Sequence, residues 1–367
     1  MKKLLSTFNP ILSFLPVQLI IKKFLVICII SLFTLFSEIK SFSSTNNENI
    51  DDYGLISIMY HRFNENKYPS TNIQLEIFKK QLEVINSENL VFIHPSKLKE
   101  QITQNKKQRK ILLTIDDGLL SFYENAWPIL KAKKIPFILF VNTREVGAYN
   151  YMNWAQIKEL YKEDFVEIGN HSHSHEYLVN ESPEVIKKDI IKAKEIFRKN
   201  LGTNSKFFSY PFGEYSLAFK KIIKDLDFDY AFGQHSGVID DTKDLFELPR
   251  FPINEKYGAI DRFKTLVKTL PFKYKKIIPE EKYLIDEKNP PKVSIEFYDN
   301  IKNLKQINCF SNEEDTWRQS NIQFINDNTL NVVLSGKFIG ERGRINCSLR
   351  EKNNFWRWLG VQFVIAD

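Results

Sequence analysis

The sequence predicts an α/β fold, a distorted (β/α) barrel of about seven strands, followed by a small C-terminal all-β domain resembling a sandwich. Two observations predict it. Up to about residue 270, short apolar runs rich in β-branched and aromatic residues alternate with amphipathic segments of helical length. After residue 292, strand patterns follow one another with no convincing helix between them. Strands separated by helices indicate parallel βαβ units, and this many units fit a barrel better than a small open sheet.

The elements follow from these patterns in order. The apolar runs of the first region are expected to form strands at residues 55–60, 90–93, 110–115, 136–141, 165–169, 206–210 and 229–233. The amphipathic segments between them are expected to form helices at residues 74–86, 121–133, 153–162, 183–199 and 215–226. Ser182 followed by Pro183 is typical of a helix start, because serine caps free N–H groups and proline suits the first turn. In the C-terminal region, alternation predicts strands at residues 293–298, 321–325, 329–334, 344–349 and 360–365.

Composition divides the chain into four regions. We expect a signal peptide or N-terminal anchor at 1–43, the barrel at 53–270, a linker at 271–291 and the β domain at 292–367. The linker is predicted because its residues are charged and proline-containing, ending in Asn289-Pro290-Pro291.

The N-terminal segment has the pattern of an export signal. Lys22 and Lys23 precede an apolar run at 24–36, and small residues follow at Ser41 and Ser43. The run is short for a bilayer span, which needs about 20 residues. We therefore expect an exported protein, periplasmic or extracellular. Because residues 11–21 are also largely apolar, an uncleaved membrane anchor is the alternative.

Composition excludes several classes of protein. The hydrophobic and charged fractions, 43% and 26%, are near globular averages, which excludes a disordered chain or a disulfide mini-protein. The net charge of +7 is small for 367 residues and its lysines are scattered, so no nucleic-acid partner is predicted, and no protein partner is inferred. Cys309 and Cys347, in the strand-rich C-terminal region, could form one disulfide or remain two buried thiols.

Two polar clusters directly follow predicted strands. Asp116, Asp117 and Gly118 follow the strand at 110–115, where a simple Asp-Gly turn is the alternative. His171 and His175 follow the strand at 165–169, and three of the six histidines of the chain fall within this short stretch. With a carboxylate from another strand, these two imidazoles would make a two-histidine, one-carboxylate metal site that leaves a position for water. His173, between them, is expected to point away.

Two further elements also follow strands. His61 comes just after the strand at 55–60, and the sequence Phe208-Ser209-Tyr210-Pro211-Phe212-Gly213 runs from a strand into a turn. Taken singly, each is usually structural. The carboxyl ends of parallel strands in a barrel share one face, where active sites are built, so all four elements are expected at that face.

These residues resemble the polysaccharide deacetylase family, the NodB-homology domain of carbohydrate esterase family 4, over about residues 53–258. The family's first motif corresponds to Thr114-Ile115-Asp116-Asp117-Gly118, its second to His171 and His175, and its third to Ser209-Tyr210-Pro211-Phe212. Met59-Tyr60-His61 resembles the subgroup that deacetylates poly-N-acetylglucosamine, in which the late catalytic histidine motif is supplied from the start of the domain.

The resemblance implies a role for each residue. Asp117, His171 and His175 would bind one divalent metal ion, with zinc expected, which polarises the acetyl carbonyl and acidifies a water. Asp116 would be the general base and His61 the general acid that protonates the leaving amine. Residues Tyr210, Pro211 and Phe212 would contact substrate or supply an oxyanion N–H.

One departure from the family pattern concerns the third motif. The family has an arginine there that orients the catalytic aspartate, and this chain has Ser209. Arg62 or Arg250 is expected to substitute. His235, which follows the last predicted strand of the barrel, is an alternative to His61 as the acid.

The resemblance implies a metal-dependent carbohydrate N-deacetylase whose partner is an acetylated polysaccharide. An O-acetyl glycan esterase and a non-catalytic glycan-binding protein on the same fold are the alternatives. Trp317, Trp356 and Trp358 could form a glycan platform, but large aromatics are mostly buried, so we expect them in the sandwich core.

Overall fold

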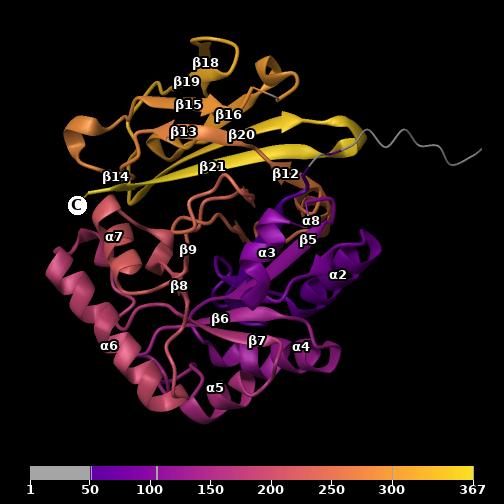
Figure 1. The fold of residues 1–367 in the computed structure, drawn as a ribbon, viewed down its shortest axis with the longest axis vertical. Coiled ribbons are helices and arrows are strands. Elements are labelled where there is room, and N and C mark those ends of the chain that lie inside the picture. Colours follow the sequence, from indigo (N-terminus) through magenta and orange to yellow (C-terminus); the bar gives the residue numbers. More distant parts are fainter. Residues whose placement is uncertain (1–49, 51, 105, 300, 367) are drawn as a thin grey trace, which may run out of the picture. The chain divides into compact units, whose positions relative to one another are not determined.

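The structure, a computed structural model, describes residue 50 and residues 52–104, 106–299 and 301–366 (Figure 1). The segment expected to be a signal or anchor, 1–43, lies outside the described residues. Within the described ranges, no helix has the length and apolar character needed to cross a bilayer.

The N-terminal half contains a curled sheet that forms a half-barrel. Its strands run in the order β10-β1-β5-β6-β7-β8-β9, with β11 beside β1 and β4 beside β5. All pairs in this sheet are parallel except β1 with β10. The strands are β1 Leu55–Tyr60, β4 Val91–Phe92, β5 Lys110–Ile115, β6 Phe137–Val141, β7 Val166–Asn170, β8 Phe207–Ser209, β9 Tyr230–Phe232, β10 Val238–Ile239 and β11 Phe251–Pro252. The predicted barrel-type α/β fold is therefore confirmed.

Helices flank this sheet at each segment that was predicted to be helical, and two short helices, at Leu98–Thr103 and Ile260–Leu266, were not predicted (Figure 1). Ser182 caps α6 by accepting a hydrogen bond from the Val185 N–H, as the Ser-Pro signature predicts. The segment expected as one helix at 121–133 begins as a π-helical turn at Phe122–Ala126, because Pro128 cannot donate to the preceding turn. The helices are α2 Leu75–Ser87, α3 Leu98–Thr103, α4 Trp127–Lys133, α5 Trp154–Tyr161, α6 Pro183–Leu201, α7 Leu217–Asp225 and α8 Ile260–Leu266.

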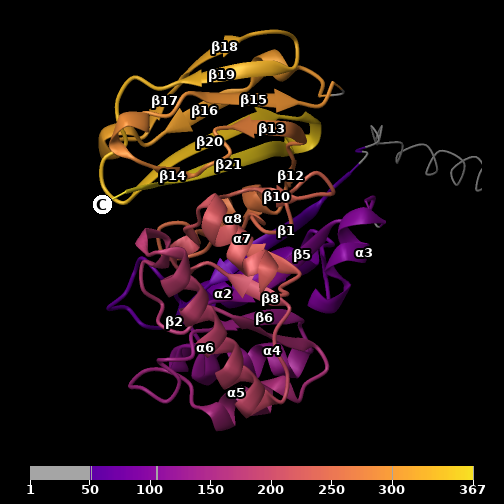
Figure 2. The ribbon, with the colours of Figure 1, turned by 60° about the vertical axis from the view of Figure 1, so that its left-hand side comes forward.

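The C-terminal strands form two sheets with an apolar core between them (Figure 2). One sheet has the order β12-β21-β20-β16-β17, with β14 beside β21, and the other β13-β15-β19-β18. Cys309 and Cys347 form a disulfide that joins register partners on β16 and β20. The strands are β12 Thr269–Pro271, β13 Tyr274–Ile278, β14 Tyr283–Leu284, β15 Val293–Phe297, β16 Asn308–Ser311, β17 Arg318–Gln319, β18 Asn321–Phe324, β19 Thr329–Val333, β20 Arg342–Arg350 and β21 Trp356–Ile365.

The segment expected as a linker contains paired strands. β13 pairs with β15, and β14 pairs with β21, so residues of 271–291 extend both C-terminal sheets. The described residues from 52 onward belong to one compact unit. The division into a barrel, a linker and a separate β domain stays a prediction.

The C-terminal sheet also contacts the half-barrel. Gly237 forms a bridge with Leu359, and the rings of Phe251 and Trp358 lie 6.3 Å apart. Trp358 thus packs against the barrel core, and Trp317 is 45% exposed. The expectation that these tryptophans fill the sandwich core is wrong, because Leu, Ile, Val and Phe side chains together with the disulfide occupy that space.

Candidate active site

The side chains singled out in the sequence follow the carboxyl ends of neighbouring parallel strands. His61 follows β1, the Asp116-Asp117 pair follows β5, His171 follows β7, and Phe212 lies just beyond β8. The Asp116 N–H donates to the Tyr60 carbonyl at 2.9 Å. This bond extends the β1–β5 pairing by one step and brings Asp116 close to the end of β1, where His61 follows. The sheet thereby gathers residues far apart in sequence at one edge.

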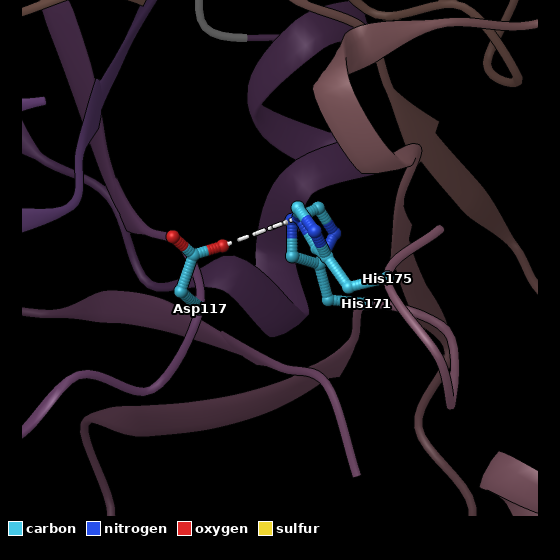
Figure 3. A group of neighbouring side chains, drawn as sticks. All are labelled: Asp117, His171 and His175. Carbon is cyan, nitrogen blue, oxygen red and sulfur yellow. Dashed lines mark ion pairs between the residues drawn. The ribbon is translucent and has the colours of Figure 1, made fainter. Parts of the chain in front are cut away.

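Asp117, His171 and His175 form a cluster of ligand-type atoms (Figure 3). Asp117 Oδ1 lies 3.4 Å from Nε2 of each histidine, and the three atoms all lie within 4.8 Å of one another. The His171 Nδ1–H donates to the Ser209 carbonyl at 2.7 Å, so the Nε2 lone pair faces the cluster.

This cluster fits a divalent cation. Asp117 Oδ1 and His171 Nε2 are buried and have no hydrogen-bond partner, which is costly unless something else satisfies them. One carboxylate oxygen and two imidazole nitrogens are donors that zinc and related metals accept. The three residues could therefore hold one metal ion.

Strained backbone accompanies the cluster. Asp117, His175 and Phe212 have φ of +76°, +54° and +58°, in the left-handed region that non-glycine residues rarely adopt. Such conformations persist where the surrounding structure enforces them, and they concentrate at functional sites. With this backbone conformation, the side chains of Asp117 and His175 point toward each other and toward His171 (Figure 3).

Burial and neighbouring charges shift the pKa values of Asp117, His171 and His175. Burial would raise the pKa of Asp117, but the adjacent His171, with His61 and His175, outweighs it and holds that pKa well below its usual range. Burial, together with the positive charge of His171, lowers the pKa of His175 to about 4. Burial also acts to lower the pKa of His171, yet the contact with Asp117 and the charge of Asp116 raise it overall.

Arg250 holds Asp116 in a bidentate pair. Its Nη1 donates to Asp116 Oδ1 at 2.7 Å and its Nη2 to Oδ2 at 2.9 Å, with both side chains fully buried. The same Nη2 donates to Ser209 Oγ at 2.8 Å, at the position where the family motif has an arginine. Burial would raise the pKa of Asp116, but Arg250 lowers it. The other candidate, Arg62, instead pairs with Glu65 at 2.8 Å.

Two histidines compete for the role of acid, and both line the same cavity, whose volume is about 750 Å³. His61 lies at the end of β1 and interacts electrostatically with Asp116 and Asp117. His235 has a buried Nδ1 without a hydrogen-bond partner. Burial, with Lys282 and Lys243 adding to it, lowers the pKa of His235 to about 3, so it stays neutral at physiological pH.

Of the third motif, Ser209-Tyr210-Pro211-Phe212, only Phe212 lines the cavity. The ring of Phe212 lies against His175 at 4.7 Å and stacks on Tyr177 at 4.2 Å, and Phe212 lines the cavity. Its N–H has no acceptor among the described residues. Tyr210 and Pro211 lie outside the cavity lining, and Tyr210 is buried with its hydroxyl donating to the Phe246 carbonyl.

One supporting residue, Asp189, was not predicted from the sequence. Asp189, on α6, accepts hydrogen bonds from the N–H groups of His173 and Ser174 at 2.7 and 3.0 Å and so fixes the histidine loop. His173 itself contacts Thr143 Oγ1 and stays outside the ligand cluster. Asp189 lies on an amphipathic helix among other charged residues, so nothing in the pattern distinguished it.

Comparison with known proteins gives matches of sequence, and the matched family model includes Asp117, His171 and His175. A family model described as polysaccharide deacetylase matches residues 103–231. The poly-beta-1,6-N-acetyl-D-glucosamine N-deacetylase of Staphylococcus aureus (strain MSSA476) is 28% identical over 208 residues, which cover 52% of this chain and 69% of that protein. The Staphylococcus epidermidis protein of the same name is 26% identical over 208 residues, with the same coverage.

Solved structures are similar in fold. The deacetylase PplD of Streptococcus pyogenes, in complex with acetate, has a TM-score of 0.54 and 22% identity, covering 59% of this chain and 99% of that one. IcaB from Ammonifex degensii has a TM-score of 0.54 and 23% identity, covering 59% of this chain and 97% of its own. These chains are matched almost completely, whereas a large part of the present chain extends beyond the match.

Proposed function

We propose that this chain, which a polysaccharide deacetylase model matches over residues 103–231, is a metal-dependent hydrolase that removes acetyl groups from an N-acetylated glycan, a polymer containing N-acetylglucosamine. The observation that supports the proposal most is the convergence of Asp117, His171 and His175 within 4.8 Å, beside a buried Asp116. The names of the staphylococcal relatives support the choice of an N-acetylated substrate. The N-terminal pattern supports export of the protein.

In this proposal Asp117, His171 and His175 hold the metal ion, which we propose is zinc. When bound, the metal supplies a Lewis acid that polarises the acetyl carbonyl and lowers the pKa of a water. The low pKa of Asp117 and the neutrality of His175 suit this task, because metal ligands must be deprotonated.

Asp116 is the proton acceptor for the attacking water. Its carboxylate is ionised because Arg250 holds it, and Arg250 also fixes its orientation. The Phe212 N–H donates to the acetyl oxygen as that oxygen becomes negative, which lowers the barrier. His61 protonates the leaving amine, and an amide leaves poorly without that proton.

Acetate release tests the proposal. Metal-loaded protein should release acetate from β-1,6-linked N-acetylglucosamine oligomers, and chelated protein should not. Asp116→Asn should keep one bound metal ion while losing turnover by roughly 10²–10⁴-fold, the usual contribution of a general base. Faster release from acetylated xylan than from the N-acetylated oligomers would favour an esterase instead. Binding without acetate release from either would mean a glycan-binding protein.

The assignment of the acid has a test of its own. His61→Ala should slow hydrolysis of the amide by roughly 10²–10⁴-fold, and slow an activated acetate ester much less, because a good leaving group needs no proton. His235→Ala is the matched control, since it lies in the same cavity and should change the amide-to-ester ratio little. If His235→Ala alone altered that ratio, the two assignments would have to be exchanged.

A further inference from the structure

The cavity that contains the candidate catalytic residues has a second wall made by the C-terminal sheet. On the barrel side it is lined by residues that include His61, Asp117 and Phe212. On the other side it is lined by residues of β16, β20 and β21. A substrate that reaches the metal cluster therefore lies against this sheet as well.

On β20, side chains that line the cavity alternate with side chains that are buried in the sandwich. Arg342, Arg344, Asn346 and Ser348 line the cavity, while the residues between them, such as Cys347, are buried in the sandwich core. Successive side chains of a strand point to opposite faces, so one strand supplies both the core and the cavity.

The charge of the cavity is one-sided. Among the described residues that line it, four are cationic (Lys256, Arg262, Arg342 and Arg344), and the one carboxylate is Asp117 of the metal cluster. Arg342 is neutralised by ion pairs with Glu214 and Glu341.

Arg262 and Arg344 are not neutralised in this way. Neither has a carboxylate within 4.0 Å among the described residues. Arg262 Nη1 donates to the Tyr257 carbonyl, and Arg344 Nε donates to Gln362 Oε1. Burial lowers the pKa of both arginines, yet an arginine stays protonated in proteins. Arg344 lies only within the longer-range attraction of Glu214. Two half-buried guanidinium groups without a carboxylate in contact cost free energy, so an anion entering the cavity would be stabilised there.

Tyr257 and Gln362 contact the two arginines, and Gln362 also connects Arg344 to the turn beside the metal cluster. The Tyr257 ring lies under Arg262, whose guanidinium carbon is 4.9 Å from the ring centroid, and Tyr257 lines the same cavity. Gln362, which accepts from Arg344, donates to the Gly213 carbonyl at 3.4 Å. Gly213 is the neighbour of Phe212, so a single glutamine side chain links Arg344 to the turn that carries the proposed oxyanion donor.

We propose that Arg262 and Arg344 form a subsite for an anionic substituent, a carboxylate or a phosphate, on the glycan that is deacetylated. The preferred substrate is then an N-acetylated glycan with acidic substituents, which binds more tightly than the uncharged polymer does. A guanidinium binds planar carboxylate and phosphate groups through paired N–H donors, which gives orientation as well as affinity. This inference rests on the proposed deacetylase function, because it concerns the same cavity.

Binding to the full chain, measured after chelation so that no substrate is consumed, tests the subsite. Three probes of equal length are compared by calorimetry: an N-acetylglucosamine oligomer with uronic-acid residues, one with phosphate substituents, and an uncharged one. At low salt, at least one acidic probe should bind about tenfold or more tightly than the uncharged probe, and added salt should reduce that difference. The probe that benefits identifies the anion.

Substitutions then locate the effect. Arg262→Gln and Arg344→Gln should each weaken binding of the favoured acidic probe about tenfold and leave the uncharged probe unchanged. Arg350→Gln is the matched control, because Arg350 lies on the same strand, is exposed and does not line the cavity. Equal affinity for all three probes, or equal weakening of all three by Arg344→Gln, would overturn the subsite.

The failure of this inference and that of the deacetylase proposal are distinguishable. Acetate release with the same kcat/KM from acidic and uncharged probes would remove the subsite and keep the deacetylase. Selective, arginine-dependent binding of an acidic probe without acetate release from any metal-loaded sample would keep the subsite and remove the deacetylase.

Discussion

At the scale of single residues, the contact between Asp116 and Arg250 organises the candidate site. A buried carboxylate is tolerated only when its charge is matched and its oxygens are hydrogen-bonded. Arg250 does both, and it fills the role that Ser209 leaves open in the third motif. Both members are fully buried, so removal of one leaves an unpaired charge in the core.

Arg250→Leu should therefore lower the free energy of unfolding by about 3–5 kcal/mol at pH 7. Arg62→Leu, at the other candidate position, should cost clearly less, because it breaks a partly exposed pair with Glu65 and a contact with the Tyr68 ring and leaves no charge buried in the core. Since Arg250 depresses the pKa of Asp116, the stability it supplies is present above the unfolded pKa near 4 and is lost as the pH falls further. Urea unfolding at pH 7 and at acid pH measures both effects, and equal losses in the two variants would contradict the assignment.

The pKa of His171 predicts how metal binding depends on pH. In the metal-free protein this pKa lies above its ordinary value, so at lower pH a cation must displace a proton from His171. Metal affinity should fall about tenfold per pH unit below that pKa, and more steeply near pH 4, where His175 also takes up a proton. Calorimetric titrations from pH 5 to 8 measure the slope. His173→Gln should not change it, and a flat profile below pH 6 would count against His171 as a ligand.

At the scale of elements, the turn after β8 positions Phe212, and its geometry depends on Gly213. Gly213 has φ of +71°, and a Cβ there would lie 2.5 Å from the Gln234 backbone nitrogen. Gly213→Ala should therefore displace the turn and reduce turnover by on the order of 10²-fold while metal binding persists. Gly147→Ala is the matched control: φ is +89°, but no atom lies within 4 Å of the added Cβ. It should cost only about 1 kcal/mol of stability and leave turnover intact, so comparable turnover in the two variants would contradict this view of the turn.

At the scale of the whole molecule, the metal cluster and the C-terminal sheet are stabilised separately. The three candidate ligands come from the half-barrel, while the Cys309–Cys347 disulfide closes a 38-residue separation within the C-terminal sheets. Replacing both cysteines by alanine should lower the free energy of unfolding by roughly 4 kcal/mol, and the protein should still bind one metal ion. Unfolding curves and metal analysis measure the two outcomes. Loss of the metal together with the disulfide would mean that the sheet helps to form the cluster.

The strands of the barrel could be predicted closely because each is a local apolar run. β1 and β5 have the predicted bounds, and β6 differs by one residue at its start. The pairing of β13 with β15 was not predicted, because β13 reads Tyr-Lys-Lys-Ile-Ile without the alternation of a strand, and its partner follows a proline-rich stretch. A half-exposed strand of that kind gains its stability from the neighbour it pairs with, which local sequence does not show.

Periodicity and motif spacing are local properties of the chain, so they predicted the fold class, the order of the barrel elements and the polar residues at the strand ends. Which arginine reaches Asp116 depends on packing: it is Arg250, 134 residues away in the sequence, and not Arg62. Only the tertiary structure placed β20 opposite the metal cluster, with Arg344 in the same cavity. These contacts depend on how the sheets pack and curl, and packing joins residues whose separation along the chain carries no signal of their proximity.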